Sequence, residues 1–289
     1  MTPREQLLTT VTRDEAFIEL NDRLDRGTMS IRLESLAGSA YTVAVAATIR
    51  KRGGVHILVA DDRDAAAYAA ADLYALLDAE RVMFLPTSYK RSIQFGQEDA
   101  GGSVQRTAAL NAIRNFHGGY LAVCTYPEAL AETVVDERSL AAQSLRISVG
   151  DTLEPNTLVE WLVEQGFVRV DFVYEPGQYS VRGGIVDIFS YVESKPYRVD
   201  FFGDEIDSLR RFDISSQLSA ERPDSVEIIA NTMHDGEDAT RVSLARFAAG
   251  ATWWISDGDF ALRKVAEVRK KVLEQAESEA DARTLASRV

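Results

Sequence analysis

Cysteine and histidine are scarce in this 289-residue sequence, with Cys124 alone and three histidines. A single cysteine excludes an internal disulfide and a cysteine-rich metal site. Its apolar surroundings, YLAVCTY, predict a buried and inert thiol. The histidines, His56, His117 and His234, are far apart and show no metal-ligand spacing such as HExxH. The sequence therefore predicts no metal site.

Long apolar runs and excess positive charge are also missing. No run approaches the ~20 apolar residues that span a bilayer, and the N-terminal residues carry charges where a signal peptide would be apolar. We therefore expect a cytoplasmic protein without membrane association. The chain has 32 Lys and Arg against 45 Asp and Glu, a formal net charge of -13. Such a surface repels phosphate, which argues against tight direct binding of DNA.

Residues 1–138 alternate helical and strand-like segments in the order typical of an α/β fold with a parallel sheet. Apolar strands are expected at 55–60, 81–86 and 120–126. The intervening helices are expected at 14–26, 39–51, 63–77 and 103–116, with a further helix from residue 127. Continuous apolar strands between helices predict a sheet that is covered on both faces.

From residue 139 to 214 the pattern changes to that of a small α+β module. A helix is expected at 155–165, followed by an alternating strand at 168–174. The stretch 174–189 predicts a strand pair with its turn at Pro176-Gly177, and 196–213 predicts a hairpin bent at Gly203-Asp204-Glu205. One helix on an antiparallel sheet leaves the other sheet face polar and exposed.

Residues 215–289 predict an accessory unit with weaker signals. Strands are expected at 225–230 and 251–257, and a long charged helix from 259 to 287. Because this helical pattern reaches the last residue without a stop signal, we expect the chain to be part of a longer one.

The segment LESLAGSAYT, residues 33–42, lies where a phosphate-binding loop would precede a helix. A working loop needs glycine at Leu33, lysine at Ser39 and a hydroxyl at Ala40, for the turn, the phosphate charge and the Mg²⁺ ligand. Only Gly38 fits the pattern. The segment is either a degenerate, inactive nucleotide site or an ordinary helix start capped by Ser39.

No catalytic constellation is predicted, and no cofactor is expected. Asp61-Asp62 at a strand end has no lysine or hydroxyl partner for a Walker-type site, so Asp62 is expected to cap the following helix. The acidic run 203–207 lies at a hairpin tip without a second group for acid–base chemistry.

Arg169 and Arg182 lie on two expected strand segments of the middle module. Each is flanked by alternating apolar residues, so we expect both to project into one patch. Exposed arginines are often solvated or paired with local acids such as Asp171 or Asp187. Arginine is also enriched at protein interfaces, because its planar group makes several charge-assisted hydrogen bonds to carboxylates.

Two motifs of the middle module resemble a known family. RGGIVDIF, residues 182–189, and PYRVDFFGDEIDSLRRFD, residues 196–213, are similar to the UvrA-contacting module shared by UvrB and the transcription-repair coupling factor Mfd. The degenerate phosphate loop favours the Mfd family. The resemblance implies a helicase-like α/β domain with a degenerate P-loop and an inserted small α+β module that binds UvrA.

The resemblance also implies a function and site residues. Arg169 and Arg182 fall on positions at which these families place UvrA-contacting arginines, and a third such position is Ser180 here. The implied role is a non-catalytic, N-terminal part that recruits nucleotide excision repair to stalled RNA polymerase. ATP-driven translocation, RNA polymerase binding and DNA binding would belong to regions outside this chain.

Two alternatives remain open from the sequence. One is an ATP-dependent helicase subunit resembling UvrB, which the substitutions in the phosphate loop oppose. The other is an autoinhibitory module that docks on the C-terminal motor domains of its own full-length chain.

Overall fold

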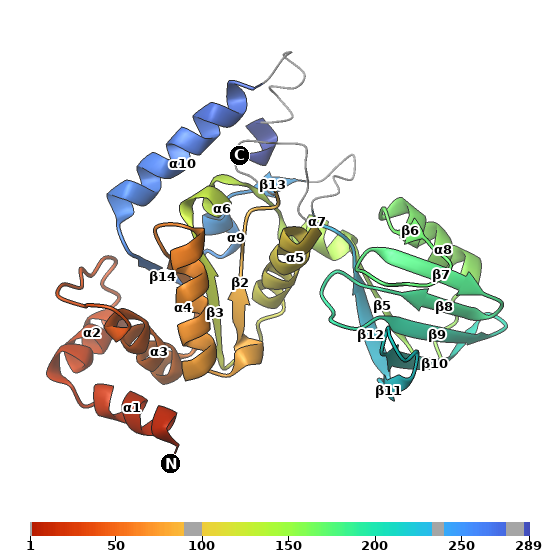
Figure 1. Ribbon diagram of the computed structural model, residues 1–289, viewed down its shortest axis with the longest axis horizontal. Coiled ribbons are helices and arrows are strands. Elements are labelled where there is room, and N and C mark those ends of the chain that lie inside the picture. The colour runs from red at the N-terminus through yellow and green to blue at the C-terminus, as the bar shows by residue number, and fades with distance from the viewer. Residues whose placement is uncertain (1, 90–99, 233–239, 276–285) are drawn as a thin grey trace.

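The computed structural model describes residues 2–89, 100–232, 240–275 and 286–289. The described chain forms two packed units side by side, one around a four-stranded sheet and the other around a six-stranded sheet (Figure 1). His234 and residues 276–285 lie outside the described residues. The C-terminal helix, which was expected to continue to residue 287, ends earlier, at Leu273.

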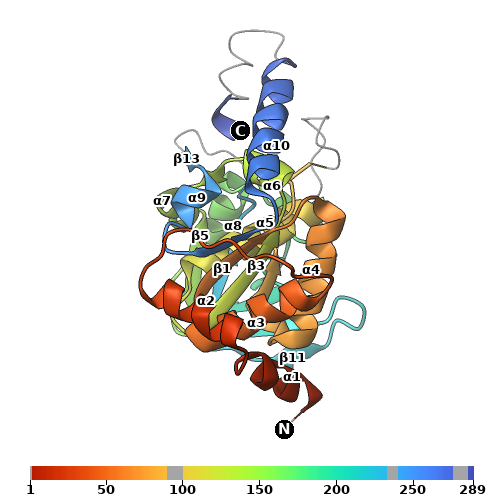
Figure 2. The same cartoon turned by 90° about the vertical axis from the view of Figure 1, so that its left-hand side faces the viewer.

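The first sheet is fully parallel and has the strand order β14-β1-β3-β2. Its strands are β1 (Gly54–Val59), β2 (Val82–Phe84), β3 (Tyr120–Thr125) and β14 (Thr252–Ile255). Leu58 lies between Cys124 on one side and Trp254 on the other. Strand β14, far away in the sequence, thus completes the sheet next to β1 (Figure 2).

Helices cover both faces of this sheet, as the continuous apolar strands predicted. Helix α4 (Arg63–Leu76) connects β1 to β2 across β3, and α5 (Ala100–Arg114) returns from β2 to β3. Because such crossovers are right-handed, the two helices lie on opposite faces (Figure 1). The Asp62 side chain accepts a hydrogen bond from the Ala65 amide at 2.8 Å, which confirms its role as the N-cap of α4.

Three further helices precede β1. Helix α3 (Ala40–Arg52) packs against α4 and β3, α1 (Pro3–Val11) packs on α3, and α2 (Glu15–Asp25) lies between α1 and α3 in the sequence. Their apolar side chains join one core with the sheet, in which Val45, Ile57 and Val123 are fully buried.

The second unit is built on a sheet with the order β11-β10-β9-β8-β7-β6. The strands are β6 (Val168–Arg169), β7 (Gln178–Arg182), β8 (Ile185–Ile188), β9 (Tyr197–Phe202), β10 (Glu205–Phe212) and β11 (Ser219–Glu221). All neighbours are antiparallel except β6 and β7, which are parallel.

One face of this sheet forms the core of the second unit. Val181, Val186, Val199 and Leu209 lie opposite one another on successive strands and point to this face. Helix α8 (Pro155–Glu164) contributes Leu158 and Leu162, both fully buried, to the same core. Strands β5 (Ser144–Ser148) and β12 (Ser225–Ile229) pair with each other and close the unit.

Two local predictions in this unit were wrong. The turn between β7 and β8 is Gly183-Gly184, where Gly183 has φ +61°, and not Pro176-Gly177. Pro176-Gly177 instead forms the turn that leads into β7. The expected strand 168–174 is regular only at 168–169, because the chain then leaves the ladder to reach that turn. The hairpin at Gly203 is confirmed, with φ +67° at this glycine.

Residues after 214 are shared between the two cores. Strand β12 packs in the second unit, whereas β13 (Arg241–Val242), α9 (Leu244–Phe247) and β14 pack with the first. Helix α10 (Gly258–Leu273) lies along α6 (Pro127–Ala131) (Figure 1). The first unit also contains η1 (Ala79–Arg81), β4 (Val134–Val135) and α7 (Glu137–Ala142). The domain limits at residues 138 and 214 stay a prediction.

Among the residues that the structure describes, none of the helices is both long and apolar enough to traverse a lipid bilayer.

Candidate functional site

The candidate site is the face of the six-stranded sheet that points away from its core, which we call the outer face. Since side chains alternate along a strand, Tyr179 and Val181 point into the core and Ser180 and Arg182 point outward. Seven residues that pair across β7 to β10 define the outer face: Ser180, Arg182, Ile185, Asp187, Arg198, Asp200 and Arg210.

Asp187 lies at the centre of the outer face and is only 1% exposed. The Arg198 Nε donates to Asp187 Oδ1 at 2.7 Å, and the Arg198 Nη2 donates to Oδ2 at 2.9 Å. The Arg182 Nη2 also donates to Asp187 Oδ2. These hydrogen bonds to Asp187 raise the pKa of Arg198. One carboxylate therefore holds two guanidinium groups, which leaves positive charge on the face.

Aromatic rings support both guanidinium groups. The Arg182 guanidinium carbon lies 5.0 Å from the centre of the Phe172 ring, and that of Arg198 lies 4.4 Å from the Phe212 ring. The Arg182 side chain is 36% exposed and that of Arg198 only 15%. Arg182 is thus the guanidinium that is both fixed in position and accessible to a partner.

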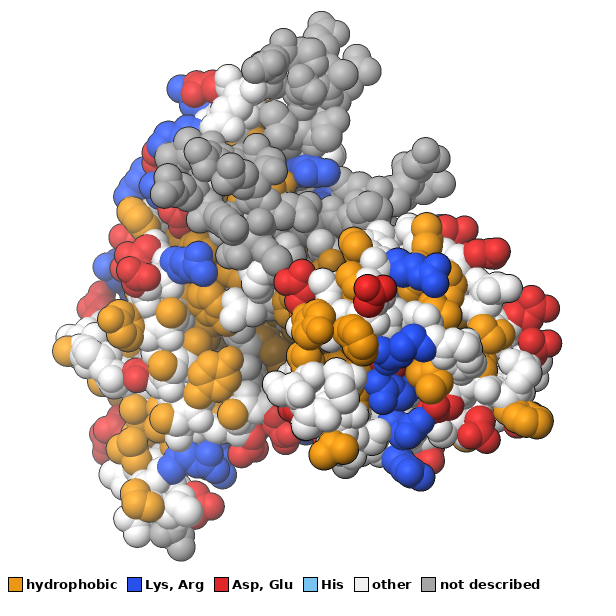
Figure 3. Space-filling model, turned by 45° about the vertical axis from the view of Figure 1, so that its right-hand side comes forward, with side chains coloured by type: hydrophobic (Ala, Val, Ile, Leu, Met, Phe, Trp, Pro, Cys, Tyr) orange, Lys and Arg blue, Asp and Glu red, His pale blue; other side chains and the backbone are white. Residues whose placement is uncertain are grey.

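Arg210 adds a third guanidinium to the outer face. Its Nε donates to Asp200 Oδ2 at 3.0 Å, and the Ser208 hydroxyl donates to the same oxygen at 2.8 Å. The face carries three arginines against two aspartates, although the chain as a whole is acidic. Figure 3 shows Lys and Arg side chains in a band across the second unit.

Arg169 is exposed, and its guanidinium has no ion pair or hydrogen bond with another described residue. In the parallel ladder Arg169 lies beside Tyr179. Residues paired in this way point to the same sheet face, so Arg169 and Arg182 emerge on opposite faces near the β6 edge. The single patch that the sequence pattern suggested for the two arginines is not formed.

Ser180 is 1% exposed, and its hydroxyl has no hydrogen-bond partner among the described residues. It faces Asp187 on the neighbouring strand, below the charged groups of the outer face. A side chain so deeply buried offers no surface for a direct contact with a partner.

Residues 33–39 of the expected phosphate-loop segment form an irregular loop that no strand precedes, so they do not make a strand-to-helix turn. Leu33 packs against the first core, and Gly38 has φ +56°. Ser39 is at the N-cap position of α3, directly before Ala40, but its side chain makes no capping hydrogen bond. The alternative of an ordinary helix start with Ser39 at the cap position is thus confirmed in its position, although the Ser39 side chain adds no capping hydrogen bond.

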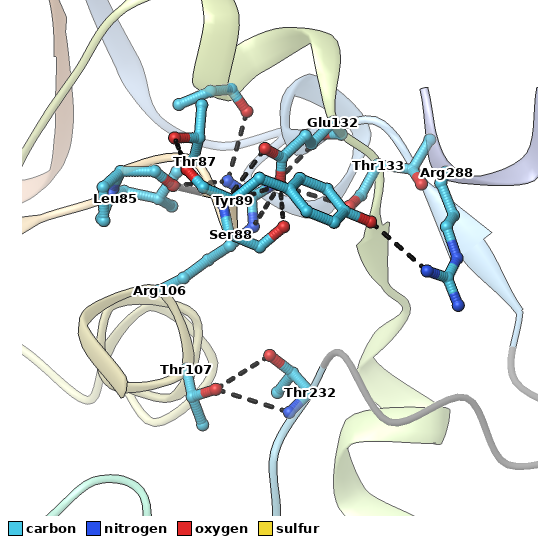
Figure 4. A network of polar contacts seen from close by, with 12 residues as sticks. Leu85, Thr87, Ser88, Tyr89, Arg106, Thr107, Glu132, Thr133, Thr232 and Arg288 are labelled. Carbon is cyan, nitrogen blue, oxygen red and sulfur yellow. Dashed lines mark hydrogen bonds and ion pairs between the residues drawn. The ribbon is translucent and has the colours of Figure 1, made fainter. Parts of the chain in front are cut away.

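A buried polar network lies beyond the carboxyl ends of β2 and β3, where α/β proteins commonly place ligands (Figure 4). Arg106 is fully buried and donates to the carbonyl oxygens of Pro86, at 2.9 Å, and Ala129, at 3.2 Å. Glu132 accepts from the Ser88 hydroxyl at 2.8 Å, and its Oε2 lies 3.7 Å from the Arg106 Nε. Side chains of the protein itself therefore fill the region in which α/β proteins commonly bind a ligand.

Sequence reasoning missed this network. Arg106, Leu110 and Ile113 are spaced to share one face of α5, and all three are buried. The position of Arg106 on the apolar face of this helix could have predicted a buried arginine. Its carbonyl partners could not be predicted, because they come from distant segments. Cys124 is fully buried, which confirms the buried thiol, and burial raises its pKa to about 12. No cluster of metal-binding side chains occurs within the described residues.

Comparisons with known proteins agree with the motif analysis. Residues 145–234 match the family described as the UvrB interaction domain. The chain is 28% identical over 225 residues to the transcription-repair-coupling factor of Bacillus subtilis, which covers 78% of this chain and 19% of that protein. It is 31% identical over 226 residues to the same factor of Myxococcus xanthus, covering 74% of this chain and 18% of that protein.

The factor of Escherichia coli is 29% identical over 197 residues, which is 68% of this chain and 17% of that protein. The chain thus spans about a fifth of the length of the curated relatives it matches. The resemblance expected from the sequence is confirmed, as is the mixed α/β fold with a parallel sheet.

Proposed function

We propose that this chain is the part of a transcription-repair-coupling factor that binds UvrA, and that it acts by docking without catalysing a reaction itself. The similarity to such factors supports a role in transcription-repair coupling. The match to the UvrB interaction domain covers the whole outer face of the second unit. Binding at this face would bring the excision-repair proteins to a stalled RNA polymerase.

One observation carries the proposal. Arg182 is partly exposed on a sheet face, with its guanidinium fixed by Asp187 on one side and by the Phe172 ring on the other. A fixed guanidinium loses little conformational entropy when it binds a carboxylate, and it can form two parallel hydrogen bonds. These are the properties of an arginine that contributes strongly to a protein interface.

The other two implied site residues have different roles in the proposal. Arg169 supplies a second, unpaired cation at the β6 edge. Ser180 acts indirectly, because its small buried side chain leaves room for Asp187 and the arginines above it. A larger residue at this position would displace Asp187.

The proposal assigns no nucleotide chemistry to this chain. Support comes from Leu33, Ser39 and Ala40, which lack the groups that bind phosphate and Mg²⁺. ATP hydrolysis, DNA translocation and contact with RNA polymerase are assigned to parts of the relatives outside the matched fifth. A calorimetric titration with ATP and Mg²⁺ tests this point, and the expected result is no saturable binding. Micromolar affinity would favour the UvrB-like helicase alternative.

The main test is the affinity of the 289-residue chain for purified UvrA. We expect Arg169→Ala and Arg182→Ala each to weaken binding by about 2 to 5 kcal/mol if their contacts are buried in the complex. Arg146→Ala is the matched control, since Arg146 is an exposed arginine on β5 of the same unit. Wild-type affinity in both test variants would contradict the proposal.

A further inference from the structure

Three large apolar side chains are exposed where β6 ends the six-stranded sheet. Val168 is 62% exposed, Phe172 48% and Tyr174 63%. We call these three residues the edge patch. Isolated apolar residues are common on surfaces, but three within seven positions beside an open sheet edge are not required by the fold.

The sheet edge at this position offers unpaired backbone groups. The Val168 amide donates to the Gly177 carbonyl at 2.8 Å, and the Val170 amide donates to the Tyr179 carbonyl at 2.9 Å. Both bonds point inward, to β7. Because amides alternate in direction along a strand, the Arg169 N–H and C=O point outward, where no further strand lies within the described residues.

The edge patch connects the two arginines of the proposed UvrA surface. Arg169 follows Val168 directly and lies on one sheet face, whereas Arg182 lies on the other. The chain from residue 169 to 172 crosses the edge between them. At its far end the Arg182 Nη1 donates to the Asp171 carbonyl at 3.4 Å, and the Arg182 guanidinium stacks on Phe172.

The arginines on either side of the patch are not fully neutralised by carboxylates of the described residues. The Arg169 guanidinium has no ion pair within the described residues, and Asp187, the carboxylate that pairs with Arg182, is shared with Arg198. An apolar centre flanked by incompletely neutralised cations fits a segment with the opposite pattern, with apolar side chains between acidic ones.

We propose that the edge patch is the apolar centre of the docking surface, and that an acidic segment of UvrA wraps around the β6 edge. Apolar side chains of that segment cover Val168, Phe172 and Tyr174, and its carboxylates reach Arg169 and Arg182 from the two sides. This arrangement explains how one partner uses two arginines on opposite faces of a sheet. The inference rests on the proposed function and adds the residues and the geometry of contact.

The test measures UvrA affinity for variants of the patch in the full 289-residue chain. We expect Tyr174→Ser and Val168→Thr each to weaken binding about tenfold, and Phe172→Ser to weaken it more because Arg182 also loses its support. The matched control is Phe202→Ser, which removes a phenylalanine that is 83% exposed beside the β9–β10 turn. The control is expected to bind UvrA like the wild type.

Salt dependence separates the two kinds of contact. Arg169→Ala and Arg182→Ala should reduce the loss of affinity between low and high salt, whereas Tyr174→Ser should leave it unchanged. Thermal unfolding checks that each variant is folded. If Phe172→Ser unfolds, Tyr174→Ser and Val168→Thr still decide the question, since both side chains are largely exposed.

The outcomes distinguish the inference from the proposed function. A wild-type chain that does not bind UvrA overturns both. If Arg182→Ala weakens binding while Tyr174→Ser and Val168→Thr bind like the wild type, the edge patch is excluded and the proposed function stands. Equal losses in Tyr174→Ser and in the Phe202→Ser control would also overturn the inference, because any exposed aromatic residue would then have the same effect.

Discussion

Arg198 and Asp187 face each other on neighbouring strands and form two parallel hydrogen bonds, at 2.7 and 2.9 Å, with the carboxylate almost completely buried. The same carboxylate accepts a hydrogen bond from Arg182. The position of the exposed arginine is therefore coupled to a buried one through a single acid. In the proposed docking surface, Asp187 would therefore act as a positioning residue and not as a contact residue.

The first prediction concerns Asp187→Asn. The variant makes the outer face more positive, so a purely electrostatic surface would bind an acidic partner more tightly. We expect weaker binding to UvrA, because Arg182 and Arg198 lose the carboxylate that fixes them. The free energy of unfolding should fall by about 2 to 3 kcal/mol, since Arg198 is left largely buried without its counter-ion. Calorimetry with UvrA and chemical denaturation measure the two effects.

Asp224→Asn is the control for the change in charge, because Asp224 directly precedes β12 of the same unit, outside the outer face. It should leave the affinity for UvrA unchanged. Tighter binding by Asp187→Asn would show that total charge, and not the positioning of Arg182, governs docking.

A second prediction is that Arg182→Lys does not replace arginine. Lysine keeps the charge but lacks the planar group that pairs with Asp187 and stacks on Phe172. We expect it to lose most of the affinity that Arg182→Ala loses. The measurement is the dissociation constant for UvrA at two salt concentrations. Near wild-type affinity of Arg182→Lys would mean that the planar guanidinium group is not required for binding.

The third prediction compares two glycines with the same backbone angle. Gly177 and Gly150 both have φ +87°, but a Cβ on Gly177 would lie 2.3 Å from the Tyr191 hydroxyl oxygen, whereas one on Gly150 would meet open space. Gly150→Ala should cost about 1 kcal/mol of stability from backbone strain alone. Gly177→Ala should cost at least about 2 kcal/mol more. Thermal unfolding of both variants measures the difference.

Gly177→Ala should also weaken UvrA binding. The Gly177 carbonyl accepts the hydrogen bond from Val168 that holds β6 in the sheet. A shift of this turn would displace the edge patch. Equal losses of stability in Gly150→Ala and Gly177→Ala would contradict the predicted clash with Tyr191.

The fourth prediction tests the buried network of the first unit. Arg106→Met leaves the Glu132 carboxylate buried with fewer partners, so the stability should fall by about 3 to 5 kcal/mol. Combining it with Glu132→Gln should cost less than the sum of the single changes, because the two groups interact. Urea denaturation measures these values, with the exposed Arg63→Ala as a control expected to lie within about 0.5 kcal/mol of the wild type. Strict additivity would exclude the coupling.

The fifth prediction concerns pH. His56 is buried, its Nδ1 accepts a hydrogen bond from Trp254 Nε1 at 3.1 Å, and its Nε2 lies 2.9 Å from the Gly53 carbonyl. Burial lowers its pKa below the usual value. The unfolded chain therefore binds a proton at higher pH than the folded one. This contribution to stability is complete above about pH 7 and decreases as the pH falls below the usual histidine pKa of about 6.5.

The measurement is the melting temperature of the wild type and of His56→Gln between about pH 8 and 5. The wild type should lose more stability than the variant over this range. His117→Gln is the control, because His117 is exposed. Parallel curves for all three proteins would contradict a buried neutral His56.

Most helices and strands of the fold could be predicted from local patterns. Helix α4 begins after Asp62 and the β9–β10 hairpin turns at Gly203, as expected, because capping and tight turns depend on a few neighbouring residues. The turn at Gly183-Gly184 was missed because Pro176-Gly177 is an equally good turn signal. Choosing between two such signals requires knowledge of the strand partners.

The candidate site could be located in the chain but not built from it. The sequence pointed to Arg182 through its motif, yet the roles of Asp187, Phe172 and Arg198 depend on cross-strand and loop contacts. Alternation along β7 agrees with the outward direction of Arg182, but at 168–169 both side chains are exposed, so no alternation of burial is seen around Arg169. Alternation does not fix the relative faces of the two arginines, because the register of a two-residue parallel ladder is not encoded in either strand alone.

The sequence by itself determined the alternation of helices and strands, the buried thiol of Cys124 and the segment that carries the family motifs, since each depends on residues close together in the chain. Only the tertiary structure decided that β14 pairs with β1, that one carboxylate holds Arg182 and Arg198, and that apolar side chains are exposed at the β6 edge. The physical reason is that strand pairing and ion pairing join distant residues, and their free energies depend on register and burial that no local pattern specifies.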